Sequence, residues 1–181
     1  ARMEQVVGGC AKGDGVGAFC ALYLSVTRGV QAELAGLAFA DPAFLARLDV
    51  VFAGLFFAAE AAYGPGGDPR HGPRAWAPLF EARGRKGVAP LQFALAGMNA
   101  HINRDLPVAL VRTCEELGVH PADGCPQHAD FLRVNALLAA VEAQVKAQYL
   151  TGALAVIDRL LHRVHRIDDV AAMWSIERAR D

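Results

Sequence analysis

The stretch GMNAHINRDL, residues 97–106, decides the fold class of this chain of 181 residues. Polar side chains occupy every second position of it: Asn99, His101, Asn103 and Asp105. Such alternation is typical of a half-buried strand. On a helix, where each residue turns by about 100°, the same side chains form two i, i+4 pairs on either side of an apolar band. We therefore interpret the stretch as a buried helix with polar edges, from which only Ala100 and Arg104 point outward.

The rest of the chain carries helical spacing and capping residues. Asp14 can cap a first helix, and Asp41 followed by Pro42 marks the start of a second, apolar one. A proline- and glycine-rich loop follows, and then a short segment around Trp76. The expected helices cover residues 15–28, 42–63, 89–106, 107–117, 128–149, 153–166 and 168–180. The sequence predicts a single all-α domain over residues 1–181, a compact bundle of about seven or eight helices around central helices at 42–63 and 89–106.

Composition narrows the class of protein. The chain is 54% hydrophobic and 20% charged, with a net charge of −1, so it has neither a basic nucleic-acid surface nor an acidic tail. The apolar run at residues 50–63 is shorter than the roughly 20 residues that a membrane span needs. No secretory signal is visible, and the four cysteines lack zinc or CxxC spacing, so we expect reduced thiols in a cytoplasmic protein. A homodimer is compatible with these features.

The central helix also indicates chemistry. A carboxylate four residues from an imidazole can fix its tautomer and raise its basicity, so His101 and Asp105 are the candidate catalytic pair. A structural role is the alternative for each polar residue, with Asp105 as the N-cap of the next helix before Pro107, and Asp130 as another N-cap. The candidate substrate-binding residues are Asn99, Asn103, Asn135, Asp130, Phe52, Phe56, Glu60, Trp76 and Met98.

Three functions are compatible with these residues. The first is an enzyme that cyclises, isomerises or eliminates a small, largely apolar molecule by acid–base chemistry without a cofactor. The second is a metal-dependent hydrolase that uses His101, Asp105, His128 and Asp130. The third is a non-catalytic module for an apolar ligand. We favour the first. We expect no bound metal, since the cysteines are unpaired in sequence and the histidines are scattered over four separate segments. His162 and His165 fit a solvated basic helix end better than a ligand pair.

The sequence also resembles a known family. The segment LQFALAGMNAHINRDLP is similar to the signature of an uncharacterised, mainly actinobacterial family of unknown function, DUF5995. The similarity extends to GDGVGAFCALYLSVT, LDVVFAGLFFAAE, the Trp76 region, DFLRVN and MWSIERARD, and so to nearly the whole chain. The resemblance implies an all-helical soluble domain and no particular activity. It also implies a shared polar set: Asn99, His101, Asn103, Asp105, Asp130 and Asn135.

Overall fold

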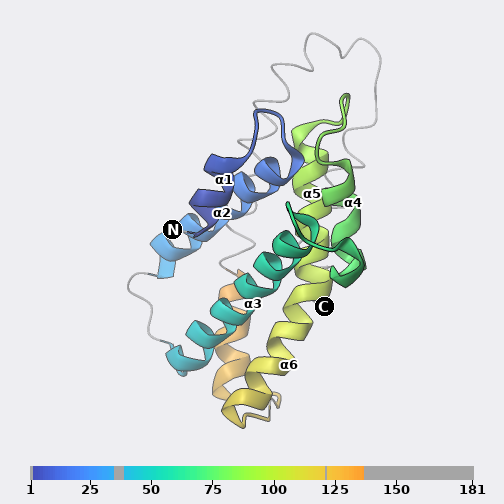
Figure 1. Cartoon of the computed structure of the whole chain (residues 1–181). Helices are drawn as coiled ribbons and strands as arrows, with labels where there is room; N and C mark the ends of the chain where they lie inside the picture. Colours follow the sequence, from blue (N-terminus) through green and yellow to red (C-terminus); the bar gives the residue numbers. More distant parts are fainter. Residues whose placement is uncertain (1, 35–38, 121, 137–181) are drawn as a thin grey trace, which may run out of the picture.

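The computed structural model describes residues 2–34, 39–120 and 122–136, and within these ranges the chain is helical with no strand. Figure 1 shows the helices packed side by side, with α5 and α6 forming one long rod. The all-α prediction is confirmed. The elements are α1 (Arg2–Gly9), α2 (Gly15–Leu34), α3 (Pro42–Tyr63), η1 (Pro69–His71), η2 (Arg74–Trp76), α4 (Ala77–Ala82), α5 (Pro90–Ala100), η3 (His101–Asp105) and α6 (Leu106–Leu117). Residues 126–136 are also helical, whereas the helices expected at 153–166 and 168–180 lie outside the described residues.

The predicted caps begin the two apolar helices. Asp14 accepts the backbone N–H of Val16 at 2.8 Å at the start of α2. Asp41 accepts the N–H of Phe44 at 3.0 Å, and Pro42 follows as the first residue of α3. The sequence did not lead us to expect α1, which precedes the glycine-rich turn and packs against α2.

The central helix departs from the prediction at one point. We expected separate helices over 89–106 and 107–117, and the structural alternative for Asp105 was a cap between them. Instead η3 is a π-helical turn in which the N–H of Leu106 bonds to the carbonyl of His101, and Asp105 makes no side-chain cap. Pro107 explains the turn, because proline has no N–H to donate and its ring crowds the carbonyl four residues earlier. The helix widens locally and continues.

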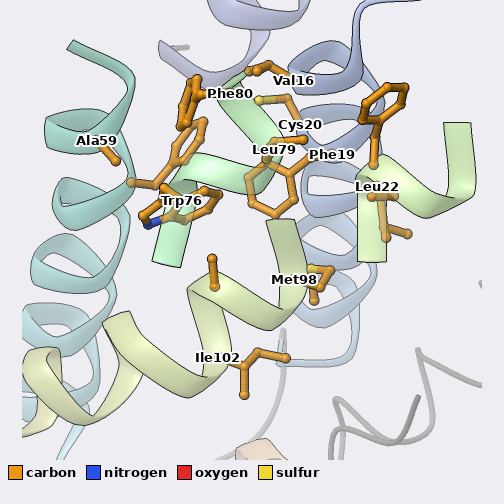
Figure 2. Close-up of a cluster of buried hydrophobic side chains, with 14 of the residues drawn as sticks. Val16, Phe19, Cys20, Leu22, Ala59, Trp76, Leu79, Phe80, Met98 and Ile102 are labelled. Atoms are coloured by element: carbon orange, nitrogen blue, oxygen red, sulfur yellow. The ribbon is translucent and has the colours of Figure 1, made fainter. Parts of the chain in front are cut away.

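The main core lies where α2, α3, α4 and α5 meet. Figure 2 shows Trp76 between Ala59 of α3 and Phe19 of α2, with Met98 and Ile102 on the neighbouring helix. Trp76 and Phe19 are fully buried, and their ring centroids lie 5.2 Å apart. A second cluster joins α3 to α6 through Phe44, Leu48, Leu55 and Ala109. Together the two clusters fix both ends of the helix that carries His101.

Helices α2 and α5 approach closely at Gly97. A Cβ atom at this position would collide with the ring of Phe19, which is itself fully buried. We expect Gly97→Ala to lower the free energy of unfolding by about 1–3 kcal/mol, because the packed ring has no room to move. Gly54→Ala is the control, since nothing lies within 4 Å of a Cβ there. Chemical denaturation of both variants measures the effect, and equal stabilities would contradict the close packing.

The helix at residues 126–136 holds the start of α3. Asp130 accepts the backbone N–H groups of Ala40 and Asp41 at 3.0 and 2.7 Å, and Gln127 donates to the Asp41 carboxylate at 2.7 Å. All four cysteines lie in the described part of the chain and are free, as predicted. Within that part, α3 is long and apolar enough to cross a membrane by length and composition alone, a test that the core helix of a soluble protein also passes.

Candidate functional site

His101 and Asp105 form a buried pair inside the π-helical turn. His101 is 1% exposed and Asp105 is 0% exposed, and the imidazole Nδ1 lies 3.1 Å from Asp105 Oδ2. Since a carboxylate accepts hydrogen bonds, we assign the proton to Nδ1, which leaves a lone pair on Nε2. Among the described residues, Nε2 is buried and has no hydrogen-bond partner. The two predicted side chains are therefore within hydrogen-bond distance of each other, and the Nε2 atom of the imidazole is buried.

Two further donors fix the carboxylate of Asp105. The indole Nε1 of Trp76 donates to Oδ2 at 3.0 Å, and the guanidinium of Arg104 donates to Oδ1 at 2.6 Å. Donors on both oxygens hold the carboxylate in one orientation, and its oxygens in turn hold the imidazole. Trp76 thus belongs to the site through a hydrogen bond, whereas the sequence suggested it only as an apolar wall.

Aromatic rings enclose the imidazole. Phe52 stacks on it, with centroids 3.7 Å apart and planes 7° from parallel, and Tyr23 meets it edge-on at 4.8 Å. Trp76 and Phe56 lie at 5.9 and 6.4 Å. Phe52 and Tyr23 are half-buried, so they separate the imidazole from the surface between α2 and α3. Any molecule that reaches Nε2 from this side has to displace one of these two rings.

Burial controls the protonation of the site. Loss of water around the ring lowers the pKa of His101, and the nearby Asp105 carboxylate only partly offsets this, so the imidazole is neutral at pH 7. Burial also raises the pKa of the Tyr23 phenol, which therefore keeps its proton. The site presents a neutral base next to a neutral phenol.

The lowered pKa of His101 predicts a pH-dependent stability. The folded protein binds this proton less readily than the unfolded chain, whose histidine pKa is near 6.5. The free energy of unfolding should therefore fall as the pH drops below about 6.5. His101→Gln should remove this part of the slope, while His71→Gln, at a side chain that is 83% exposed, should keep it. Denaturation curves between pH 4 and 8 measure the slope, and an unchanged slope in His101→Gln would contradict the assignment.

The asparagines of the central helix do not join the pair. Asn99 and Asn103 are exposed and bond to each other at 2.5 Å. Ala100, which the helical wheel placed outward, is instead 2% exposed and packs in the main core. That prediction was wrong because neighbouring helices cover more of α5 than the apolar band alone indicates.

Asp130 has the structural role described above rather than a place beside His101. Its two backbone bonds and an ion pair with Arg133 at 3.7 Å use both oxygens. Asn135 is half-buried, and its Oδ1 has no partner within the described ranges. In the DFLRVN motif, residues 130–135, at least Asp130 therefore stabilises the fold and does not act on the His101 imidazole.

A substitution of Asp130 distinguishes a structural role in the fold from a role in the candidate site. Asp130→Ala removes a fully buried carboxylate that accepts the N–H groups of Ala40 and Asp41, so we expect the free energy of unfolding to fall by about 1–3 kcal/mol. Turnover per folded molecule should stay unchanged. Measuring both quantities on one preparation tests this, and a loss of turnover without a loss of stability would return Asp130 to the site.

The other predicted residues lie elsewhere. Met98 is 4% exposed in the main core. Glu60 lines a different hollow, of about 480 Å³, together with Arg2 and Arg83. His128 lines an apolar groove of about 530 Å³ between the end of α6 and residues 126–136. The described residues contain no group of three or more His, Cys, Asp or Glu side chains that could hold a metal, so His101, Asp105, His128 and Asp130 do not meet as ligands.

Sequence reasoning missed three residues near the imidazole. Tyr23 lies in the helix expected over residues 15–28 but was not named as a site residue, and Arg104 was predicted to point outward. Asp49 was not considered; burial raises the pKa of its carboxyl, and His101, when protonated, lowers it. The sequence carried a weak signal for Asp49, which lies three residues before Phe52 in a mostly apolar helix.

Comparison with known proteins adds the family and nothing about activity. No curated protein and no solved structure matches the chain. One family model does, across residues 1–181, and its description is a family of unknown function. The chain therefore belongs to the DUF5995 family.

Proposed function

We propose that this protein is an enzyme that performs acid–base chemistry on a small, largely apolar molecule without a cofactor. The observation that carries the proposal is the Nε2 atom of His101, which is buried and lacks a partner in the described part of the chain while Nδ1 is held by Asp105. A buried nitrogen lone pair left without a donor costs free energy that a purely structural histidine would avoid by bonding. Its retention fits a base that meets its proton only on a substrate.

The local backbone supports the same function. A π-helical turn is uncommon and is frequent at functional sites. Here the imidazole of His101 and the carboxylate of Asp105 stand at the two ends of the π-helical turn and lie 3.1 Å apart. The neutral state of His101 at pH 7 is the state that a general base requires.

The chemistry that suits this site is one proton transfer in a dry environment. Cyclisation, isomerisation or elimination of an apolar molecule requires shape together with such a transfer. The neutral phenol of Tyr23, whose ring centroid lies 4.8 Å from that of the imidazole, is the candidate donor for a developing oxyanion. Asp105 holds the tautomer and stabilises the imidazolium that forms.

Proton exchange tests this function before a substrate is known. A panel of hydrophobic ketones in D₂O is followed by NMR for exchange at the carbon next to the carbonyl. We expect the protein to accelerate exchange of at least one ketone, and His101→Gln to lose the acceleration by a factor of about 10² or more. His71→Gln is the matched control at an exposed imidazole. Equal rates for wild type and His101→Gln would refute the proposal.

A second function is favoured by a separate observation. The groove of about 530 Å³ near α6 is lined mainly by apolar side chains, among them Phe44, Leu110, Val119 and Phe131. A groove of this size and lining suits a small apolar ligand. If the chain is a binding module and not an enzyme, ligand contacts should map to this groove and leave the resonances of His101 unchanged.

A further inference from the structure

Arg104 contacts the buried pair from the surface side of the π-helical turn. Its guanidinium donates to Oδ1 of Asp105 at 2.6 Å, and the side chain of Arg104 is 34% exposed whereas that of Asp105 is 0% exposed. Neighbouring residues of a helix normally point in directions about 100° apart and do not face each other. The side chain of Arg104 therefore folds back toward the buried carboxylate instead of extending into water.

This contact balances the charge of the buried carboxylate. Asp105 Oδ2 lies 3.1 Å from His101 Nδ1, and the two side chains are 0% and 1% exposed. Beside a neutral imidazole alone, the carboxylate would leave one negative charge away from water, and such a charge is costly unless an opposite charge pairs with it. Trp76 Nε1 donates to the carboxylate from a neutral indole, so Arg104 supplies the positive charge.

Without the guanidinium, a proton would have to supply that charge. The imidazole is the more basic of the two groups, so it would take the proton. A histidine that holds protons on both nitrogens has no lone pair and cannot act as a base. Burial of the imidazole lowers the pKa of His101 and the Asp105 carboxylate raises it, so a cation on that carboxylate favours the neutral form.

Other titratable groups near the imidazole do not supply the positive charge. Tyr23 of α2 meets the ring at 4.8 Å, and burial raises the pKa of its phenol, which is therefore neutral. Asp49 of α3 is exposed and carries a negative charge, which raises the pKa of His101. The rings of Phe52 and Trp76 carry no charge.

We propose that Arg104 is a positioning residue of this site, which holds Oδ1 of Asp105 and supplies the positive charge that lets His101 stay unprotonated on Nε2. The inference deepens the proposed function by naming what keeps the base neutral. It rests on that function only for the purpose of the unprotonated Nε2. Arg104 acts through Asp105 and does not touch the substrate.

Proton binding by the folded protein tests this role without a substrate. NMR follows the imidazole resonances of the full chain between pH 4 and 9, and the His101 signal is assigned by its absence in His101→Gln. In the wild type we expect the midpoint to lie below 6.5, the value of a free histidine. Arg104→Gln should raise the midpoint above 6.5, with proton binding at least about tenfold tighter than in the wild type.

Two further variants separate the charge of Arg104 from its shape. Arg104→Lys keeps a positive charge beside Asp105, so its midpoint should stay below 6.5. Arg47→Gln breaks an exposed ion pair with Glu116 elsewhere and should titrate as the wild type does. An Arg104→Gln midpoint below 6.5, or an Arg104→Lys midpoint as high as that of Arg104→Gln, would overturn the inference.

The pH dependence of stability gives a second readout. Folded Arg104→Gln binds this proton more tightly than the unfolded chain, so its free energy of unfolding should rise as the pH falls from 8 to 6, whereas that of the wild type should not. A variant that is unfolded at pH 8 and folded at pH 6 supports the inference, and one that is unfolded at both overturns it.

The titration and the ketone assay can fail independently. If Arg104→Gln raises the midpoint while no ketone exchanges, the proposed catalysis is wrong and the role of Arg104 in the charge balance stands. If a ketone exchanges and the midpoint does not change, the role of Arg104 is wrong and the proposed function stands.

Discussion

Replacing His101 by glutamine lowers the turnover of the site by a factor of about 10² or more and leaves the helical fold in place. Glutamine keeps an amide that can donate to Asp105, but it has no lone pair of comparable basicity to replace Nε2. The imidazole is the group enclosed by Phe52 and Tyr23, and its Nε2 has no partner among the described residues. The measurement is the initial rate with the ketone that shows exchange, together with circular dichroism on the same sample.

Two further variants serve as controls for His101→Gln: one removes an imidazole elsewhere, and the other removes the charge beside His101. His71→Gln removes an imidazole that is 83% exposed and should keep full turnover. Asp105→Asn keeps the shape of the side chain but removes the charge that stabilises the imidazolium, so its rate should also fall. A His101→Gln protein with normal turnover would leave His101 as a core residue and end the catalytic assignment.

Most of the fold was predictable because its signals are local. Asp14, Asp41 and Pro42 act through the backbone within a few residues, so their caps could be assigned from sequence alone. The sequence alone could not show that the two expected helices join at Pro107, because a proline there permits either a break or a widened turn. Packing of both halves against α2 and α3 favours the continuous helix.

The sequence predicted the His101–Asp105 pair and part of its surroundings, since Phe52, Phe56 and Trp76 were named and lie around the imidazole. An i, i+4 spacing is enough to place an imidazole beside a carboxylate, so His101 and Asp105 followed from sequence. The place of Tyr23, the stacking of Phe52 and the Trp76 hydrogen bond were not predicted, because they depend on how α2, α3 and η2 meet the central helix. The same holds for Asn99 and Ala100, whose exposure is set by neighbours and not by the helix itself.

The largest effect on stability should come from Asp105→Ala. Its carboxylate accepts from Trp76 Nε1 at 3.0 Å and from Arg104 at 2.6 Å, and it lies 3.1 Å from His101 Nδ1. Removing the acceptor leaves the buried donors Trp76 Nε1 and His101 Nδ1 without a partner, at a cost of about 1–3 kcal/mol each.

The expected loss is a large part of the free energy of unfolding, which is typically about 5–15 kcal/mol. The urea concentration at which half of the protein is unfolded should therefore be much lower than in the wild type. Asp105→Asn should cost less, because its carbonyl oxygen can still accept from Trp76 or His101. Asp123→Ala, at a fully exposed carboxylate, should leave the midpoint unchanged. Urea denaturation of the three variants gives the order of their stabilities directly. If Asp105→Ala unfolds at the same urea concentration as Asp123→Ala, the buried network does not hold the π-helical turn, and the orientation of His101 must depend on ring packing alone.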